Sequence, residues 1–400
     1  MLFRSGVSSF SIRYTRKFLC NTANVTQQFW RDTAFWILFV VKKSDNSIHI
    51  KLEGRVDKLI LPDGFLFFYF FVTYVLSPNK MTYEEIVKVA QSCIGDKCHA
   101  CFICNGKACK NTVPGPGAKG VGDTAIRNYE KWQAIRVNMN TICGNKNVDT
   151  TFELFGKTFK YPFFIAPVGA VFLHYSDKYD DEKYFATIVP AAKKAGIAAF
   201  TGDGQNPVVM EGATQVIKEN GGMGVPTLKP WNIDVINEKM AKIKDANPLA
   251  VAMDVDAAGL PFLKGMTPPA GGKTVAELAE IMKAADKPFI VKGIMTVKGA
   301  LKAVEAGASA IVVSNHGGRV LDQCPATAEV LPEIVDAVKG KIKIFVDGGI
   351  RSGTDIFKAL AIGADGVLIA RPYVTAVYGG GAEGVKVFTE KFGEELKDTK

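Results

Sequence analysis

The chain has 400 residues, of which 48% are hydrophobic and 22% charged, and its formal net charge is +9 at pH 7. This balance excludes a disordered or fibrous protein, and the length suits one large domain with an appendage or two average domains. The positive charge alone would suit nucleic acid, but no zinc finger, basic zipper or RNA-binding sheet occurs, so we expect a basic enzyme that binds a phosphate-bearing small molecule, with no nucleic-acid partner.

The first 80 residues differ from the rest of the chain. They begin with MLFRSGVSSFSIRYTRKFL, which is basic and serine-rich, and they contain no acidic residue before Asp32, a composition typical of a mitochondrial transit peptide. The apolar runs AFWILFVV and FLFFYFFVTYVL are shorter than the roughly 18 to 20 residues that a membrane-spanning helix needs. We therefore expect residues 1–80 to be a presequence or upstream read-through outside the fold, without a membrane span. The protein would then be cytoplasmic, or imported into mitochondria if this segment is a genuine presequence.

The composition changes at Met81. The stretch MTYEEIVKVAQSC predicts an amphipathic helix, and the spacing of Thr82 and Glu85 predicts a capping box at its start. We therefore expect the folded protein to begin here.

A cysteine-rich stretch, CHACFICNGKACKNTVPGPGAKG, dominates residues 81–125. Its cysteines have the spacing C-x2-C-x2-C-x4-C and are Cys98, Cys101, Cys104 and Cys109. Closely spaced cysteines suit zinc or an iron–sulfur cluster. The alternatives are a redox-active disulfide and a glycine-rich lid that merely contains thiols. Such thiols indicate a reducing compartment.

Residues 126–400 alternate short apolar strands with helical stretches. Three phrases recur, AGIAAFTGDG, AGASAIVVSNHGG and IGADGVLIARP, each with a helix end, a glycine and an apolar strand that runs into a polar loop. Their spacing follows multiples of about 28 residues, close to the size of one strand–helix unit. Counting in these units gives eight strands, centred near residues 165, 199, 224, 251, 290, 312, 345 and 368.

Eight apolar strands that alternate with helices predict a parallel sheet covered by helices, closed into a TIM (β/α)8 barrel. A doubly wound open sheet is the competing fold. It would normally carry a phosphate-binding glycine loop after its first strand, and IAPVGAVFLH is not such a loop.

Polar residues follow the predicted strands at their carboxyl ends, where a TIM barrel places its active site. They are Asp254, Lys292, Ser314, Asn315, His316, Arg319, Asp347, Arg351 and Arg371. The loop VDGGIRSGTDIFKAL fits a phosphate site, because its glycine pair allows close backbone approach, Ser352 is an expected N-cap and the next helix would offer free amides. Arg351 and Arg371 would add charge-assisted hydrogen bonds. The alternative is a tight turn with two solvent-facing arginines.

Three further side chains suggest the chemistry. Lys292 would lie in the barrel mouth, where a fixed cation can stabilise negative charge that develops on a cofactor. The alternatives are a lysine that forms a Schiff base, which would imply an aldolase, and a structural salt bridge with Asp254. His316 would offer a neutral imidazole as a base near pH 7, although a lone histidine is more often structural. Arg319, three residues after His316, has a planar guanidinium group that can bind both oxygens of a carboxylate. Together they suggest oxidation of an acid at its α-carbon.

The motifs SNHGGR, the IVKG before it and the VDGGIRSGTDIFKALAIGADGVLIARP after it resemble the FMN-dependent α-hydroxy acid oxidases and dehydrogenases, which include glycolate and lactate oxidase. The resemblance covers about residues 126–398. It implies that an L-2-hydroxy acid gives its hydroxyl proton to His316 and a hydride to FMN, while Asp254 orients the imidazole and Arg319 binds the carboxylate. It also implies FMN contacts from Pro167, Val168, Gly169, Thr201, Lys292, Ser314, Asp347, Gly348, Gly349, Arg351, Ala370 and Arg371.

The chain departs from the family pattern around the substrate. The segment GVPTLKPW lacks the glutamine and tyrosine that are usual after the third strand, and Ala252 stands where the family has a threonine. No second arginine follows Asp254, and no tyrosine that would contact the substrate is recognisable in the N-terminal part. The identity of the substrate and of the electron acceptor therefore stays open. The alternative functions are a flavin-dependent isomerase or reductase on the same barrel, and a non-catalytic electron carrier that binds flavin and metal. A cluster at the cysteines would carry electrons from the flavin, as in a dehydrogenase. We expect a homo-oligomer.

Overall fold

The computed structural model describes residues 37–41, 56–60, 66–70 and 81–400, except 143, 145, 146, 264, 266 and 268. The chain divides into two units, Met1–Lys80 and Met81–Lys400, so the second unit begins where the composition changes. In the first unit, three strands form an antiparallel sheet with the third in the middle; they are β1 (Ile37–Val41), β2 (Val56–Ile60) and β3 (Leu66–Phe70). The transit-peptide-like stretch lies outside the described residues.

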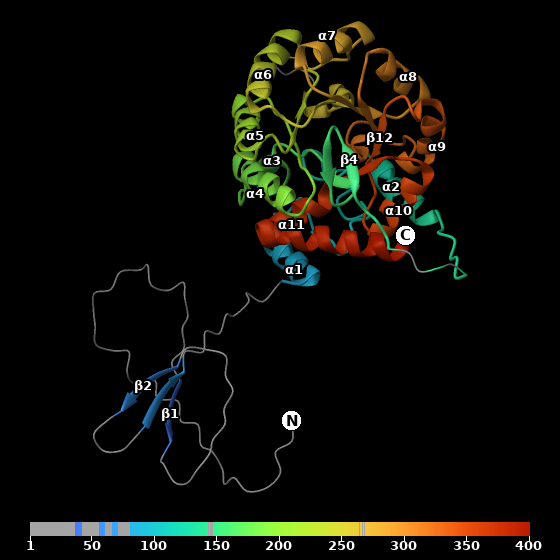
Figure 1. The fold of residues 1–400 in the computed structure, drawn as a ribbon. Coiled ribbons are helices and arrows are strands. Elements are labelled where there is room, and N and C mark those ends of the chain that lie inside the picture. The colour runs from blue at the N-terminus through green and yellow to red at the C-terminus, as the bar shows by residue number, and fades with distance from the viewer. Residues whose placement is uncertain are drawn as a thin grey trace. The chain divides into compact units, whose positions relative to one another are not determined.

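The second unit is a TIM barrel, as the sequence predicts (Figure 1). Its parallel strands are β6 (Phe163–Ile165), β7 (Phe200–Thr201), β8 (Val225–Leu228), β9 (Val251–Asp254), β10 (Phe289–Ile294), β11 (Ala310–Val313), β12 (Lys343–Val346) and β13 (Gly366–Ile369). They pair in the order β6-β13-β12-β11-β10-β9-β8-β7. A single parallel bridge from Ile165 to Ala199 joins the two end strands. All eight predicted strands are confirmed, and the open doubly wound sheet was the wrong alternative.

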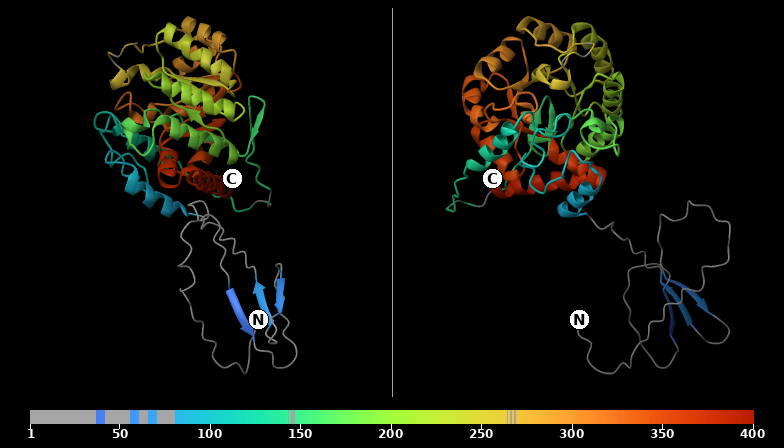
Figure 2. Two further views of the ribbon diagram at one scale, coloured as in Figure 1. Left: turned by 90° about the vertical axis from the view of Figure 1, so that its left-hand side faces the viewer. Right: turned by 180° about the vertical axis from the view of Figure 1, so that it is seen from behind.

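Helices surround the strands on the outside (Figures 1 and 2). The longer ones are α4 (Asp181–Lys194), α5 (Pro207–Glu219), α6 (Ile233–Ala246), α7 (Val275–Ala285), α8 (Val297–Glu305), α9 (Thr327–Val338), α10 (Gly353–Ile362) and α11 (Arg371–Thr399). Short turns of helix lie in the loops between strand and helix: α3 (Val171–His174), η1 (Val255–Gly259), η2 (Pro261–Leu263) and η3 (His316–Gly318). Within the described residues, no helix is both long and apolar enough to cross a bilayer.

Helix α1 (Tyr83–Cys93) begins at the predicted capping box, which is confirmed. The backbone N–H of Glu85 donates to Thr82 Oγ1 at 3.2 Å, and the N–H of Thr82 donates to Glu85 Oε2 at 2.8 Å. The helix packs on α11 so closely that a Cβ added at Gly379 would lie 2.0 Å from the carbonyl oxygen of Ile86. Helix α1 is therefore packed tightly against the helical layer that surrounds the strands.

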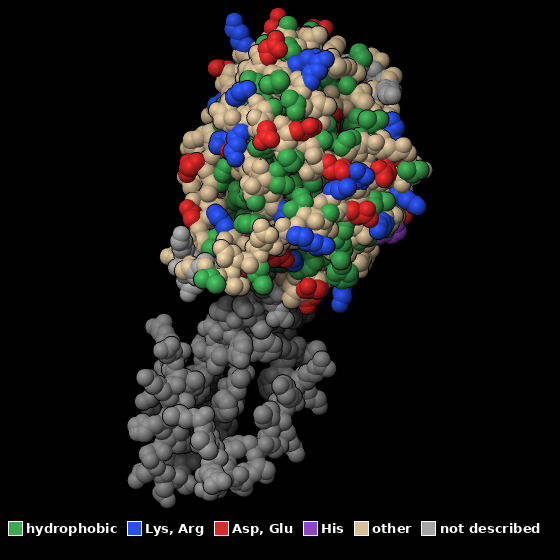
Figure 3. Space-filling view, turned by 90° about the vertical axis from the view of Figure 1, so that its right-hand side faces the viewer, with side chains coloured by type: hydrophobic (Ala, Val, Ile, Leu, Met, Phe, Trp, Pro, Cys, Tyr) green, Lys and Arg blue, Asp and Glu red, His purple; other side chains and the backbone are tan. Residues whose placement is uncertain are grey.

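A hairpin of β4 (Phe152–Leu154) and β5 (Lys157–Phe159) lies across one mouth of the barrel (Figure 1). The Phe152 ring packs against Phe164 and Phe345 inside the barrel, with centroid distances of 6.0 and 6.3 Å. On the face of the unit shown in Figure 3, basic and acidic side chains are interspersed, so that face has no continuous basic surface.

Candidate active site

A pocket of about 300 Å³ lies at the carboxyl ends of the strands. Five cationic and three anionic side chains line it, an excess of two positive charges that favours an anionic ligand: Lys229, Lys292, Arg319, Arg351, Arg371, Asp203, Asp254 and Asp347. The structure brings most of the residues predicted for the site to this pocket; besides the predicted charged ones, they are Pro167, Val168, Gly169, His316, Gly348, Gly349 and Ala370. Three others, Thr201, Ser314 and Asn315, are buried and do not line the pocket.

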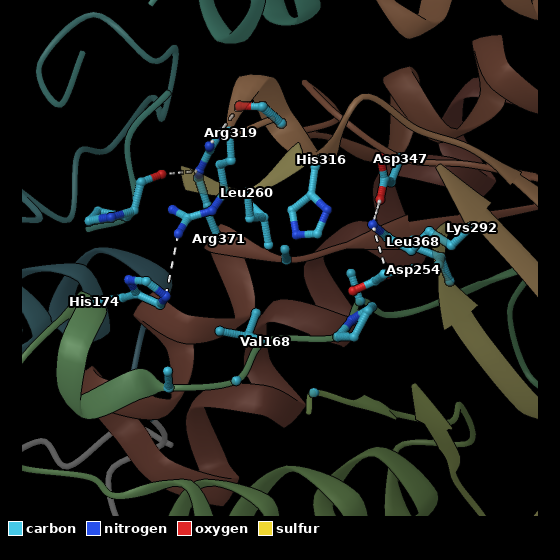
Figure 4. Close-up of a pocket in the computed structure, with 18 of the residues that line it drawn as sticks. Val168, His174, Asp254, Leu260, Lys292, His316, Arg319, Asp347, Leu368 and Arg371 are labelled. Carbon is cyan, nitrogen blue, oxygen red and sulfur yellow. Dashed lines mark hydrogen bonds and ion pairs between the residues drawn. The ribbon is translucent and has the colours of Figure 1, made fainter. Parts of the chain in front are cut away.

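Asp254 and Lys292 are neighbours because they are register partners in the β9–β10 ladder. The Nζ of Lys292 lies 3.3 Å from Asp254 Oδ1 and 3.8 Å from Asp347 Oδ2 (Figure 4). Lys229, in the loop after β8, donates from its Nζ to Asp254 Oδ2 at 2.6 Å. Burial alone would raise the pKa of Asp254, but the two lysines outweigh it and hold the pKa well below its usual value. The predicted salt bridge is therefore present, and Asp254 is a permanent anion between two cations.

Lys292 is a fixed cation. Burial acts to lower its pKa, but the neighbouring carboxylates, with Asp254 first, outweigh burial and raise the pKa above its usual value. A Schiff-base lysine needs the opposite shift, toward a free amine at pH 7. The geometry therefore disfavours the aldolase alternative and suits a cation that stabilises negative charge.

His316 begins the short turn η3, which Ser314 and Asn315 separate from the end of β11, and it has a left-handed φ of 55°. Its Nδ1 lies 3.2 Å from each carboxylate oxygen of Asp256. The expectation that Asp254 makes this contact was wrong, because Asp254 at the end of β9 turns toward the two lysines while Asp256 lies in η1. Burial and the charge of Lys292 lower the pKa of His316. The imidazole is therefore neutral at pH 7, as a general base requires.

A bulge in β10 makes room for Asp256. The register between β10 and β11 shifts between Lys292 and Ile294, and Gly293 between them has a φ of 102°, in the region that favours glycine. A Cβ at Gly293 would lie 2.5 Å from Cγ of Asp256. Any side chain at this position would therefore displace the carboxylate that holds His316.

Helix α2 (Asp123–Ala134) positions the loops after β11 and β12. Asn128 exchanges two side-chain hydrogen bonds with Asn315, at 2.8 and 2.9 Å. Trp132, which is fully buried, donates from Nε1 to the carbonyl oxygen of Gly348 at 2.8 Å. At Gly349, with φ of 82°, a Cβ would lie 2.3 Å from the carbonyl oxygen of Asn128. The glycine pair is thus needed for close contact with α2 as well as for the pocket.

Arg351 and Arg371 line the pocket and are not the solvent-facing pair of the alternative prediction. Arg351 donates from Nε to the carbonyl oxygen of Cys104 at 2.7 Å. Arg371 donates from Nε to the carbonyl oxygen of Pro116 at 2.8 Å, and from Nη2 to that of Gly317 at 3.0 Å. The cysteine-rich stretch therefore covers the predicted phosphate region and orients both guanidinium groups.

The start of α10 differs from the prediction of free amides. Ser352 is the N-cap as predicted, and it accepts from the N–H of Asp355 at 3.1 Å. The N–H of Gly353, however, donates to Glu395 Oε2 of α11 at 2.7 Å, and the N–H of Arg351 donates to Asp355 Oδ2 at 3.0 Å. These amides are satisfied within the protein, so the arginines and the glycine pair are the better candidates for holding an anion.

Arg319 lies partly buried beside His174, a pocket residue that the sequence analysis missed. Its Nη1 donates to the carbonyl oxygens of Gly115 and Gly117, and its Nη2 lies 3.3 Å from Nε2 of His174. Burial and the charge of Arg371 lower the pKa of Arg319 to about 10, so it stays a cation at pH 7. Burial and the charge of Arg319 lower the pKa of His174 to about 3. The only sequence signal for His174 was the rarity of histidine, with four in the chain.

A buried ion pair, also missed, fixes the loops after β7 and β8. Asp203 Oδ1 accepts from the Nζ of Lys239 on α6 at 2.5 Å. Its Oδ2 accepts from Trp231 Nε1 at 2.7 Å and from the backbone N–H of Lys229 at 2.9 Å. Because every bond of this carboxylate is used within the protein, its role is to hold Lys229 in place beside Asp254.

Several buried oxygens at the strand ends have no hydrogen-bond partner within the described residues. They include Thr201 Oγ1, Thr227 Oγ1 and Asp347 Oδ1. Leaving such an atom unpaired costs about 1 to 3 kcal/mol, so their positions indicate a polar group that the protein binds here. The loops after β6 and β7 meet backbone to backbone beside them, since a Cβ at Gly202 would lie 2.4 Å from the nitrogen of Gly169. Unpaired polar atoms, a glycine cradle and excess positive charge suit a polar cofactor that carries a phosphate.

The predicted metal site at the cysteines is not formed by the described residues. All four are thiols outside any disulfide, and in this part of the chain the one group of three or more donor atoms within 4.8 Å of one another is Asp254, Asp256 and His316. That group adjoins two lysines, which disfavours a metal cation.

Known proteins resemble this chain in sequence and in fold. A sequence profile described as FMN-dependent dehydrogenase matches residues 116–263 and 262–399. L-lactate oxidase of Lactobacillus jensenii is 47% identical over 122 residues, 30% of each chain, and glycolate oxidase of Spinacia oleracea is 37% identical over 223 residues, 55% of this chain and 56% of that protein. The chain thus spans about a third to a half of the length of these relatives. A crystal structure of mandelate oxidase with benzoylformic acid has a TM-score of 0.64 and 26% identity, and the match covers 80% of this chain and 92% of that one.

Proposed function

The chain belongs to the family of FMN-dependent dehydrogenases, and from that premise we propose that it binds FMN and oxidises an L-2-hydroxy acid to the 2-oxo acid. The observation that carries the proposal is a neutral, partly buried His316 held by Asp256 in the same pocket as Arg319. A base beside a carboxylate clamp is what the oxidation of a 2-hydroxy acid needs. The relatives that match the chain are named as oxidases of lactate, glycolate and mandelate, which supports the same class of substrate.

The pocket residues fit FMN. Arg351 and Arg371 would hold its phosphate, and the unpaired oxygens of Thr201, Thr227 and Asp347 would accept or donate hydrogen bonds to its polar groups. When bound, FMN supplies the acceptor for the hydride that leaves the α-carbon. Lys292, whose charge is fixed by the surrounding carboxylates, would stabilise the negative charge that results.

His316 performs the proton transfer in this proposal. Its Nδ1 faces Asp256, so the neutral ring carries its proton on Nδ1 and leaves Nε2 as the acceptor. Nε2 takes the hydroxyl proton of the substrate as the hydride leaves, and the products are the 2-oxo acid and an imidazolium. The Asp256 carboxylate stabilises that imidazolium by a charge-assisted hydrogen bond.

Arg319 binds the substrate carboxylate in this proposal. It stays charged at pH 7 although it is partly buried, and the carbonyls of Gly115 and Gly117 fix the orientation of its guanidinium. Apolar side chains of Leu260 and Leu263 line the pocket as well, so they would face the rest of the substrate.

An anaerobic titration tests the proposal. Full-length protein loaded with FMN would be mixed with a panel of 2-hydroxy acids, and the flavin absorbance near about 450 nm would be followed. We expect at least one acid to bleach it, and readmission of air would then distinguish an oxidase from a dehydrogenase. Flavin that no 2-hydroxy acid bleaches would refute the reaction. Equal bleaching of wild type and His316→Ala would refute the base and favour the electron-carrier alternative.

A further inference from the structure

His316 has a strained backbone conformation. It and the next two residues, Gly317 and Gly318, have positive φ angles of 55°, 64° and 81°. Glycine adopts this left-handed region without a steric penalty, whereas in any other L-residue the Cβ comes too close to the following carbonyl oxygen. His316 is therefore the strained residue of this turn. Such a conformation persists only where neighbouring contacts hold it, and it occurs preferentially at functional sites.

Helix α2 contacts this turn at both ends. After His316, a Cβ added at Gly318 would lie 3.0 Å from the backbone nitrogen of Ala125 and 3.2 Å from Cβ of Thr124, so the first turn of α2 packs directly against it. Before His316, Asn315 bonds to Asn128 of the same helix. The two contacts of α2 are about one helical turn apart, so a single face of the helix makes both.

The pair of Asn128 and Asn315 consists of two reciprocal hydrogen bonds between buried amides. Nδ2 of Asn128 donates to Oδ1 of Asn315 at 2.8 Å, and Nδ2 of Asn315 donates to Oδ1 of Asn128 at 2.9 Å. Two further bonds fix which way the amides point. Nδ2 of Asn315 also donates to the carbonyl oxygen of Pro325, and the N–H of Thr327 donates to Oδ1 of Asn128, both at 3.1 Å. The orientation of Asn315 is therefore set by groups outside its own turn.

Asn315 in turn fixes the start of the strained turn. Its carbonyl oxygen accepts from the N–H of Gly318 at 3.0 Å, which closes the turn around His316. In this conformation the imidazole points into the pocket (Figure 4) and its Nδ1 faces Asp256. A change of φ at His316 to the common negative values would change the direction of its Cα–Cβ bond, and the ring would leave Asp256.

We propose that Asn128 is a positioning residue for the base: through Asn315 it holds His316 in the strained conformation that presents the imidazole to the substrate. The inference rests on the proposed function for the role of His316 as the base. The geometry of the turn does not depend on that role.

Helix α2 can hold a strained turn because it is anchored elsewhere. Arg127 donates from Nε and Nη2 to the carboxylate of Glu329 on α9, each at 2.6 Å. Trp132 donates to the carbonyl oxygen of Gly348 in the loop after β12. Neither bond involves the turn at His316, so relaxation of the turn would not release the helix.

Two variants at position 316 measure the strain itself. His316→Ala and His316→Gly both lack the imidazole, so the difference between their Tm values reports the cost of a Cβ in the left-handed turn. We expect the Tm of His316→Gly to be about 2 to 4 °C higher, the reverse of the usual advantage of alanine over glycine. In the background of Asn128→Leu, which removes both amide hydrogen bonds at similar size, the turn relaxes and the difference should vanish. A difference of the same size in both backgrounds would overturn the proposal.

Kinetics measures the consequence for the base. In full-length, FMN-loaded Asn128→Leu, we expect flavin reduction by a saturating 2-hydroxy acid to slow by about 10- to 100-fold, the effect of displacing a catalytic group by roughly 1 Å. KM should change little, because Arg319 is untouched. Arg127→Leu is the matched control, since it loses two hydrogen bonds of α2 but none to the turn, and its rate should equal that of the wild type. A normal rate in Asn128→Leu, or an equal loss in Arg127→Leu, would contradict the assignment.

A second variant covers the case in which Asn128→Leu does not fold. Asn128→Asp keeps the acceptor for the N–H of Thr327 and loses only the donor to Asn315, so it should also reduce its flavin more slowly, and a normal rate would overturn the proposal. If no 2-hydroxy acid reduces the flavin of the wild type, the proposed reaction is refuted. The Tm comparison, made with Asn128→Asp where needed, then still decides whether Asn128 holds the strained turn.

Discussion

Replacing Asp256 by asparagine tests which carboxylate serves His316. The variant keeps the size of the side chain but removes the charge that lies 3.2 Å from Nδ1 of His316. A hydrogen bond to a charged group contributes about 1.5 to 3 kcal/mol, and each 1.4 kcal/mol is tenfold in rate. Since the imidazolium forms only as the substrate proton is transferred, we expect flavin reduction at saturating 2-hydroxy acid to slow by about 10- to 100-fold.

The pH dependence provides a second readout of the same change. Protonated His316 cannot act as a base, so kcat/KM falls as the pH drops through its pKa. Burial and Lys292 lower that pKa, whereas Asp256 raises it. The acid limb of the wild type should therefore lie below the usual histidine value of about 6.5, and in Asp256→Asn it should move to still lower pH.

Asp254→Asn is the matched comparison, because Asp254 is two residues away and was the carboxylate expected from the sequence. It sits between Lys229 and Lys292 with a side chain only 3% exposed, and breaking a buried pair costs about 3 to 5 kcal/mol. We therefore expect Asp254→Asn to lower the Tm strongly and Asp256→Asn to change it little. Stopped-flow reduction of the flavin and thermal denaturation would be measured on both. A slow Asp254→Asn variant of normal stability, beside an Asp256→Asn variant of normal rate, would refute the assignment.

Three further changes follow from the packing around the site. Gly293→Ala should slow flavin reduction as Asp256→Asn does, because the added Cβ displaces the Asp256 carboxylate. Gly271→Ala is the control, since a Cβ there meets nothing within 4 Å. Equal rates of flavin reduction for the two variants in stopped-flow experiments would contradict this prediction. Trp132→Phe removes the donor to the carbonyl oxygen of Gly348, so it should lower the free energy of unfolding by about 1 to 3 kcal/mol, measured by urea denaturation. It should also weaken FMN binding, measured by a flavin fluorescence titration. Unchanged FMN affinity would argue against a role of α2 in the phosphate site. Thr82→Ala should cost about 1 kcal/mol through loss of the helix cap and leave the rate of flavin reduction unchanged, and a slower rate would show that α1 affects the chemistry.

The barrel could be predicted from the sequence because its signals are local and repeated. Each strand is mainly apolar and is followed by a helical stretch. The polar residues of the site fall at or just after the strand ends, where Lys292 and His316 are found. The contacts of these residues were less predictable. Asp254 and Asp256 both follow β9, and only the turn of η1 and the bulge at Gly293 decide which one reaches the histidine.

Contacts between distant segments account for the other differences. His174 accepts a hydrogen bond from the backbone N–H of Gly115, 59 residues earlier in the chain. The periodicity of a sequence does not predict such a contact. The backbone N–H of Gly353 at the start of α10 donates to Glu395, 42 residues later in the chain. The cysteine spacing predicts a metal site, but spacing does not report how the loop directs its sulfur atoms, and the described residues do not bring them together.

The closure of the barrel has a consequence for how it opens. Seven of the eight strand junctions are ladders, whereas β6 and β7 are joined by the single bridge from Ile165 to Ala199. The least protected amides of the barrel wall should therefore lie at this junction, which makes it the natural start of local unfolding. The loops that continue from these two strands carry Gly169 and Gly202, which line the pocket where FMN is proposed to bind. A cofactor that contacts both loops would stabilise the junction of β6 and β7. Binding of the cofactor and the stability of the barrel would therefore be thermodynamically linked.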